Sequence, residues 1–266
     1  MNDTVQHLMT PDGSIRAVTI DARETVSQIL KAQEPGELSE ALGELLMGAT
    51  LVRSTMAPDH RLQMTLKYPG FSIYADALPH GKARGWVAAR ENSLSKPQFQ
   101  VARVLESGQV HEGTIEAEAS ISETLTTYMM SSEQTTSTVG VSCSIVDGEV
   151  IWARGFMVQL LPNPSAQALE AVTLALENLQ PDWPELDDTF LGLAILGDSF
   201  RLLSNEELSF GCTCSASSVE RAMVAAGKHE VDDMLTAGEP IEVVCEFCRT
   251  KYVVSPEDLK RIAQTF

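Results

Sequence analysis

The sequence has few basic residues. Its 266 residues include 19 Lys and Arg against 37 Asp and Glu, which gives a formal net charge of −18 at pH 7. Proteins that bind nucleic acids attract phosphate groups with Lys and Arg, and polybasic surfaces dock on anionic membranes in the same way. The charge balance therefore argues against nucleic-acid and membrane partners.

Long apolar runs are also missing. The longest apolar stretch, residues 190–196, contains a glycine and is far shorter than the roughly 18 residues that a membrane-spanning helix needs. The first ten residues, MNDTVQHLMT, have neither the basic flank nor the apolar centre of a secretory signal. We therefore expect a cytoplasmic protein, and its 44% hydrophobic residues indicate a globular one.

The common enzyme motifs are absent. The sequence contains no phosphate-binding GxxxxGK[ST], no GxGxxG after a strand, no HExxH and no GxSxG. The acidic pairs Asp187-Asp188 and Glu206-Glu207 lie in a strongly acidic segment, so we interpret them as solvated surface and not as acid–base catalysts. We expect no enzymatic activity.

Charge and cysteine content divide the chain into three parts. Residues 1–176 carry 12 basic and 20 acidic groups, a net charge of −8. Residues 177–208 carry one basic and eight acidic groups, a net charge of −7 within 32 residues. Residues 209–266 have a net charge of −3 and contain four of the five cysteines. We expect an N-terminal domain, an acidic linker and a C-terminal domain with these boundaries.

The first part mixes helix and strand patterns. Leucines at helical spacing predict a long amphipathic helix over residues 37–56, and Ser120 and Glu123 form the capping box of a second helix. Alternating or β-branched segments predict strands at 14–21, 61–67, 71–77, 83–90, 99–105, 110–117, 138–146 and 150–160. Turns such as Asp147-Gly148 make many neighbours hairpins, so the fold class is α+β on a largely antiparallel sheet.

The middle part combines dense acids with large apolar residues. Apolar positions such as 190, 193, 194 and 200 predict a helical stripe, with mutually repelling acids on the other face. Such a segment folds only where it docks on another surface. An ordinary linker with one or two surface helices explains the same pattern, and the local signals do not separate the two interpretations.

Four of the five cysteines form two close pairs. Cys212 and Cys214 are followed, after thirty residues, by Cys245 and Cys248. Two close pairs of thiolates are a typical ligand set for tetrahedral zinc. Four protein ligands leave no open position for water, so the site is structural and not hydrolytic. We expect one zinc ion per chain, held by these four cysteines in a small C-terminal zinc domain.

The size of the C-terminal part makes zinc important for its folding. A core within 58 residues contributes only about 3–5 kcal/mol to folding. Zinc binding contributes about 10–16 kcal/mol to units of this kind. Oxidation of the cysteines removes the ligands, because a disulfide binds zinc poorly. The pattern therefore predicts a switch between a zinc-bound folded state and an oxidised unfolded state.

Two further candidate ligands have simpler explanations. Cys143 lies in a predicted strand with alternating apolar residues, which indicates a small buried side chain. His229 lies between the cysteine pairs, but four cysteines already complete the zinc shell. We expect His229 on the surface.

The cysteine motif and three other segments together resemble one protein family. The motif is Cys212-Thr-Cys214-Ser215, then Cys245-Glu-Phe-Cys248 followed by Tyr252. The other segments are LGELLMGATL at 42–51, YMMSSEQ at 128–134 and GFMVQLLP at 155–162. Over nearly its whole length the chain is similar to the redox-regulated holdase chaperones of the 33-kilodalton heat-shock protein family.

The resemblance implies a function and a role for each cysteine. The reduced protein binds zinc through Cys212, Cys214, Cys245 and Cys248 and is mostly inactive. Oxidants release zinc and form the disulfides Cys212–Cys214 and Cys245–Cys248. The C-terminal domain then unfolds, the linker loses its structure, and exposed apolar surface binds unfolding client proteins without ATP. Activated members of the family commonly form homodimers through the N-terminal domain.

Two other classes of function compete with this one. A constitutive zinc-ribbon interaction module would keep its zinc and bind one specific partner in the reduced state. An enzyme on the α+β domain lacks a visible nucleophile–base pair or cofactor motif. A thiol oxidoreductase is a variant of the latter, because CxxC exchanges disulfides, but the CxC pair and the metal-like spacing argue against it.

Overall fold

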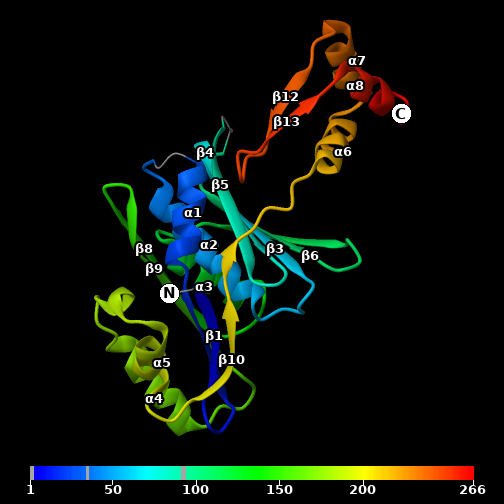
Figure 1. The fold of residues 1–266 in the computed structure, drawn as a ribbon. Coiled ribbons are helices and arrows are strands. Elements are labelled where there is room, and N and C mark those ends of the chain that lie inside the picture. The colour runs from blue at the N-terminus through cyan, green and yellow to red at the C-terminus, as the bar shows by residue number, and fades with distance from the viewer. Residues whose placement is uncertain (1–2, 34–35, 91–93) are drawn as a thin grey trace. The chain divides into compact units, whose positions relative to one another are not determined.

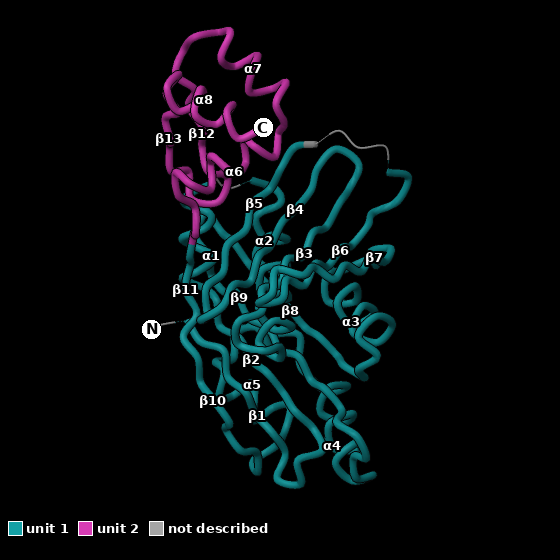
Figure 2. The backbone as a smooth tube through the Cα atoms, turned by 90° about the vertical axis from the view of Figure 1, so that its right-hand side faces the viewer, with its two compact units in different colours: residues 1–211 teal, residues 212–266 magenta. Residues whose placement is uncertain are grey.

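The computed structural model describes residues 3–33, 36–90 and 94–266, which form two compact units (Figure 2). Unit 1 comprises Met1–Gly211 and unit 2 comprises Cys212–Phe266. Each unit has a hydrophobic core of its own. The acidic segment 177–208 belongs to unit 1.

Unit 1 contains two sheets (Figure 1). The five-stranded sheet is antiparallel, with the order β10-β1-β2-β9-β8. Its strands are β1 (Thr4–Met9), β2 (Ile15–Asp21), β8 (Ser137–Val146), β9 (Glu149–Leu160) and β10 (Arg201–Glu207). The six-stranded sheet has the order β11-β5-β4-β3-β6-β7, and only its β11–β5 pair is parallel. The predicted α+β fold on largely antiparallel sheets is confirmed.

Five strands of the second sheet match the predicted segments closely. They are β3 (Arg61–Tyr68), β4 (Gly70–Leu78), β5 (Lys82–Arg90), β6 (Gln98–Val104) and β7 (Val110–Glu116). The short sixth strand, β11 (Ser209–Phe210), was not predicted. The predicted turn between β8 and β9 also forms. Asp147 and Gly148 have φ angles of 52° and 81°, the left-handed values that a tight hairpin turn of this type requires.

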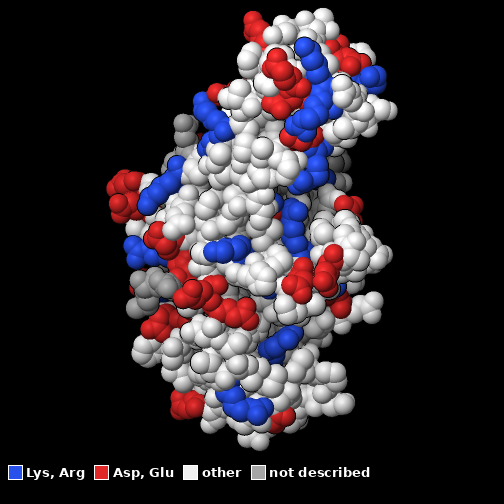
Figure 3. All heavy atoms as spheres, turned by 45° about the vertical axis from the view of Figure 1, so that its right-hand side comes forward, with Lys and Arg blue, Asp and Glu red and all other residues white. Residues whose placement is uncertain are grey.

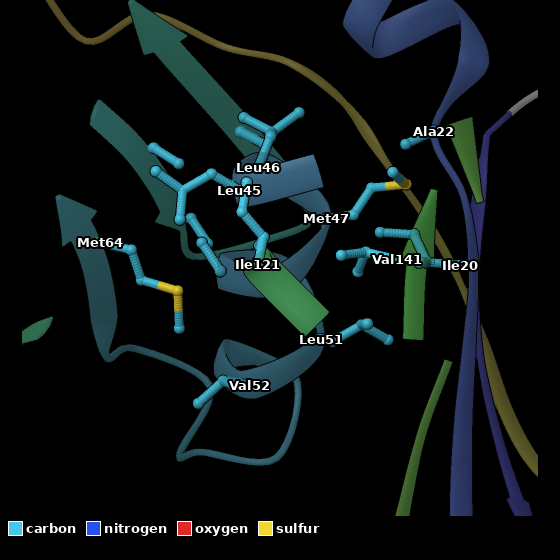
Figure 4. Close-up of a cluster of buried hydrophobic side chains, with 14 of the residues drawn as sticks. Ile20, Ala22, Leu45, Leu46, Met47, Leu51, Val52, Met64, Ile121 and Val141 are labelled. Carbon is cyan, nitrogen blue, oxygen red and sulfur yellow. The ribbon is translucent and has the colours of Figure 1, made fainter. Parts of the chain in front are cut away.

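The core of unit 1 is built around one helix. The helices of this unit are α1 (Arg23–Gln33), α2 (Ser39–Arg53), α3 (Ile121–Ser131), α4 (Ala166–Glu177) and α5 (Asp188–Leu196), with a 3₁₀ turn at Trp183–Glu185. The predicted long helix is α2, which contacts strands of both sheets. In Figure 4, Met47 points from α2 towards Ile20 and Val141, and Leu45 lies on the opposite side towards Met64. Because both sides of α2 are covered, nearly all its residues are buried.

Close packing explains one glycine of α2. A Cβ atom added at Gly43 would lie 2.6 Å from Sγ of Cys143 on β8. Only a residue without a side chain lets the helix approach the strand this closely.

The predicted capping box of α3 is confirmed, since Ser120 and Glu123 exchange hydrogen bonds.

Helices α4 and α5 cover the other face of the five-stranded sheet. They enclose a second, smaller core that contains Leu8, Phe156, Val172, Leu191 and Ile195. The predicted stripe through positions 190, 193, 194 and 200 is wrong. The buried side of α5 carries Leu191 and Ile195, whereas Phe190 is 60% exposed. The sheet face determines which side of this almost entirely apolar helix is buried.

One acid of the middle segment, Asp188, does not fit the interpretation as solvated surface, whereas its neighbour Asp187 is exposed. Asp187 caps α5 and accepts hydrogen bonds from the N–H groups of Thr189 and Phe190. Asp188 is buried and accepts a 2.5 Å hydrogen bond from the hydroxyl of Thr4. Burial raises the pKa of Asp188 to about 6. The acid is therefore part of the contact between α5 and β1.

Unit 2 is small and has one hydrophobic cluster. Its elements are α6 (Ala216–Ala226), α7 (Lys228–Ala237), β12 (Ile241–Val244), β13 (Lys251–Val254) and α8 (Pro256–Ala263). The strands form an antiparallel hairpin, and the three helices pack together beside it. Ser215 and Ser255 cap α6 and α8, so two of the three helices begin at a serine that satisfies their first N–H groups.

The surface of the protein shows no segregated charge on the face in Figure 3. Lys and Arg side chains are interspersed there with Asp and Glu among uncharged residues. The acidic excess of the sequence is therefore not gathered in one patch on this face. None of the helices in the described parts of the chain is long and apolar enough to cross a membrane.

Candidate metal centre

The local structure of unit 2 brings the two cysteine pairs together. Cys212 and Cys214 lie on an extended segment directly before α6. Cys245 and Cys248 lie in the turn between β12 and β13. In this turn the N–H of Cys245 donates to the carbonyl of Thr250, and the N–H of Arg249 donates to the carbonyl of Cys245. The turn thereby points both sulfurs to one side.

The four sulfur atoms converge at one point. Sγ of Cys212 lies 3.6 Å from Sγ of Cys245, and Sγ of Cys214 lies 3.3 Å from Sγ of Cys248. All four ligand atoms lie within 4.8 Å of one another. A tetrahedral zinc ion with bonds of about 2.3 Å requires sulfurs that are about 3.8 Å apart. The four predicted residues therefore form a cluster that can hold a metal ion, and its dimensions fit zinc.

Two residues of the β13 side hold the sulfurs in place. The hydroxyl of Tyr252 donates a hydrogen bond to Sγ of Cys214 at 3.1 Å. Oγ1 of Thr250 lies 3.2 Å from Sγ of Cys248. Hydrogen bonds of this kind orient metal ligands and adjust their basicity. Sequence reasoning noted Tyr252 only as part of the motif and missed Thr250, although both follow the CxxC pair within four residues.

The protonation of the sulfurs is uneven. Burial raises the pKa of Cys214 to about 12. Burial also acts on Cys248, but hydrogen bonds with Thr250 and with the Cys214 thiol outweigh it and lower the pKa of Cys248 to about 6. One sulfur therefore ionises readily while its neighbour keeps its proton. A bound dication favours all four thiolates, so metal binding is expected to release protons.

The two cations nearest in sequence are paired with acids. Arg249 lies 2.6 Å from a carboxylate oxygen of Glu246, and Lys251 lies 2.9 Å from one of Glu242. Four thiolates around a dication carry a net charge of −2. Because these ion pairs already occupy the cations, the cluster presents no excess of positive charge to a polyanion.

The two remaining candidates lie where the sequence predicted. Cys143 is buried in the core of unit 1, and burial raises its pKa to about 12. A thiol in this state is unreactive. The side chain of His229 is 86% exposed and lies 3.1 Å from the carboxylate of Asp233. Neither residue is part of the cysteine cluster.

Comparisons with known proteins identify the family. The family model described as "Hsp33 protein" matches residues 3–255. A 33 kDa chaperonin of Syntrophotalea carbinolica is 30% identical, over 98% of this chain and 99% of its own. One of Enterococcus faecalis is 28% identical, over 97% and 95%. The crystal structure of the 33 kDa chaperonin (heat shock protein 33 homolog) of Thermotoga maritima superimposes with a TM-score of 0.85 at 22% identity, covering 100% of this chain and 99% of that one. Family model, relatives and fold agree over nearly the whole chain, which therefore belongs to the Hsp33 family of chaperones.

Proposed function

We propose that the protein is a redox-regulated holdase, which binds unfolding or oxidatively damaged proteins without ATP and prevents their aggregation. The observation that carries the proposal is the convergence of Cys212, Cys214, Cys245 and Cys248 within a unit that has little core of its own. In a chaperone family, such a unit can act as the sensor that controls client binding.

In the reduced state, the four cysteines bind one zinc ion. Zinc would hold four thiolates and thereby stabilise unit 2, without offering an open position for catalysis. Tyr252 and Thr250 keep the sulfurs of Cys214 and Cys248 oriented towards the ion. The hydrogen bonds of the β12–β13 turn hold the second pair in place.

Oxidation by a peroxide supplies the switch. Two thiolates lose two electrons and form one S–S bond, while the O–O bond of the peroxide breaks and two protons from solvent complete two water molecules. Two such reactions consume all four ligands and release zinc. We assign the disulfides as Cys212–Cys214 and Cys245–Cys248. Unit 2 then loses the ion that stabilises its fold.

The middle segment, residues 177–208, supplies apolar surface once it detaches. Helix α5 covers Leu8 and Phe156 on the five-stranded sheet. Its own contact includes the buried carboxyl group of Asp188, which weakens the attachment because burial disfavours a charge. Leu202 and Leu203 on β10 are already more than half exposed. We propose that clients bind the surface exposed by this segment, and that the active form is a cytoplasmic homodimer.

The test follows light scattering from a heat-unfolding client and zinc release in the same sample. Reduced, zinc-loaded protein is compared with protein treated with peroxide under mild heat. We expect the oxidised protein to release about one zinc ion per chain and only then to suppress aggregation. Cys143→Ala is the matched control, because it removes the one cysteine outside the cluster.

Two results would contradict the proposal. Zinc that stays bound after oxidation would show that the cluster is not a sensor. Equal suppression in the two states would show that client binding does not depend on oxidation. Either result would favour a constitutive zinc-ribbon module with a specific partner.

A further inference from the structure

Strand β8 is one edge of the five-stranded sheet, yet its outward N–H groups are not free. The N–H of Val139 donates to Oγ1 of Thr126 at 3.0 Å, and that of Val141 donates to Oγ of Ser122 at 3.0 Å. The N–H of Ile145 donates to Oε1 of Glu40 at 2.9 Å.

The same pattern continues at the residue between these positions. The N–H of Cys143 faces the carboxyl group of Glu44 and acts to lower the pKa of that group. From residue 139 to residue 145, the N–H group of every second residue thus bonds to or faces a side chain. We call the acceptors Ser122, Thr126, Glu40 and Glu44 the edge ladder.

Helix geometry explains how four side chains match four strand positions. Ser122 and Thr126 are one turn apart on α3, and Glu40 and Glu44 are one turn apart on α2. Four helical residues rise about 6 Å, and two strand residues rise about 6.6–6.8 Å. A helix that lies along the edge can therefore place an acceptor at every second residue of the strand. The hydroxyl of Ser122 also lies 3.4 Å from the carbonyl oxygen of Val141, to which it can donate.

The opposite edge of the sheet is built differently. Strand β10 pairs with β1 on one side only. In the described structure, no N–H group of residues 201–206 donates to a side chain. Unpaired N–H and C=O groups on an edge strand are a template for a strand from another chain. The two edges of one sheet thus differ in whether that template is open.

We propose that the edge ladder closes β8 to strand addition by a second copy of this chain, so that this sheet can be extended only at its β10 side. The partner excluded is the β8 strand of another molecule, which would pair antiparallel through the same N–H groups around a twofold axis. This inference concerns unit 1 alone and does not depend on the redox proposal.

The first test measures amide hydrogen exchange in the wild-type protein. We expect the N–H groups of Val139, Val141 and Ile145 to exchange roughly tenfold or more slowly than those on the outward side of β10, because each has a hydrogen-bond partner. Equally fast exchange at both edges would overturn the proposal without any variant.

The second test removes two rungs of the ladder. The double variant Ser122→Ala, Thr126→Val should speed exchange at Val139 and Val141 and form concentration-dependent dimers in sedimentation velocity. The matched control is Thr127→Val, Ser131→Ala, with the same spacing on the same helix but hydroxyls that bond Glu118 and the helix backbone. A folded double variant that stays monomeric with unchanged exchange would refute the proposal, as would equal dimerisation of the control. If the double variant does not fold, the exchange rates of the wild-type protein decide.

Discussion

Unit 1 and unit 2 are stabilised in different ways. The main core of unit 1 contains 34 buried hydrophobic residues of the described chain, packed around α2 between two sheets. The cluster of unit 2 contains six, namely Val219, Met223, Val231, Val254, Leu259 and Ile262. Burial of each large apolar side chain contributes about 1.5–3 kcal/mol before the loss of chain entropy is counted. Six such residues among 55 cannot stabilise a fold strongly, whereas the core of unit 1 can.

The comparison shows how one chain can contain a stable part and a conditional part. Unit 1 has a core of its own, and all the buried residues of that core lie between Val5 and Leu208, before the first cysteine of the cluster. Unit 2 is built around that cluster, which joins the segment before α6 to the β12–β13 turn. Chemistry at four atoms can therefore unfold one unit and leave the other folded.

The largest expected effect comes from loss of the metal. Chelation, or Cys248→Ser, should remove the roughly 10–16 kcal/mol that zinc binding contributes and unfold unit 2, while the main core of unit 1 stays folded. Limited proteolysis with mass spectrometry would show new cleavage after residue 176 only, in the middle segment and in unit 2. Cys143→Ala should leave the zinc content unchanged. If unit 2 resisted the protease without metal, its fold would not depend on the cysteine cluster, and the contrast with unit 1 would be wrong.

The next effect compares one buried leucine in each unit. Leu45→Ala in unit 1 and Leu259→Ala in unit 2 each remove a fully buried side chain and should cost about 2–5 kcal/mol. In unit 2 the loss from Leu259→Ala is about as large as the whole contribution of its hydrophobic core. The folding of unit 2 would therefore depend still more strongly on the metal. We expect Leu259→Ala to weaken zinc affinity at least roughly 30-fold in a chelator competition. An unchanged affinity would show that unit 2 folds independently of its ligand.

A third prediction concerns the pH dependence of unit 1. Burial raises the pKa of Glu44 to about 7 from the usual 4.5. Between pH 4.5 and pH 7 the folded state therefore holds a proton that the unfolded state has lost. The contribution of Glu44 to stability is fully present below pH 4.5 and is lost as the pH rises through 7. The raised pKa of Asp188 also makes unit 1 more stable at low pH than at high pH. Burial lowers the pKa of His7, so protonation of His7 at low pH destabilises the folded state. Glu44→Gln should remove up to about 3 kcal/mol of the stability difference between pH 4.5 and 8 in urea unfolding. A pH profile identical to that of the wild type would show that Glu44 titrates normally.

A smaller effect should follow from the hydroxyl of Tyr252. Tyr252→Phe removes the hydrogen bond to Sγ of Cys214 and leaves the ring in place. Loss of such a bond typically weakens metal affinity by about 10–100-fold. Competition with a chromophoric chelator measures the change, and Tyr74→Phe in unit 1 serves as a control. Equal affinities for the wild type and Tyr252→Phe would mean that the hydroxyl does not orient the ligand.

The smallest expected effect is at Arg249, directly after the second cysteine pair. Its φ angle is +57°, in the left-handed region that favours glycine. Arg249→Gly should stabilise unit 2 by up to about 1 kcal/mol, because the exposed ion pair with Glu246 contributes little. Arg249→Val should have the opposite sign. The thermal midpoint of metal-loaded unit 2 in the full chain would distinguish the two, and a gain with valine would refute the argument from backbone strain.

Sequence patterns were reliable where a single local property decides the structure. The hairpin at Asp147-Gly148 requires left-handed backbone, and the cap at Ser120 requires a side-chain acceptor, so both could be predicted. Helix α1 was missed, although Val26, Ile29 and Leu30 have helical spacing. Strands β1 and β10 were also missed: they pair with each other from opposite ends of unit 1, with Thr4 opposite Glu207, and the sequence RLLSNEE of β10 has no alternating apolar pattern.

The sequence by itself determined most strands of the two sheets of unit 1, the division of charge and the four candidate ligands, because these depend on residue type and spacing. Only the tertiary structure decided which side of α5 is buried, because its helix is apolar nearly all round. It also decided that Asp188 is buried and that the N–H groups of β8 bond to side chains from two helices. These features depend on which surfaces meet, and residues far apart in the chain carry no local signal of that contact.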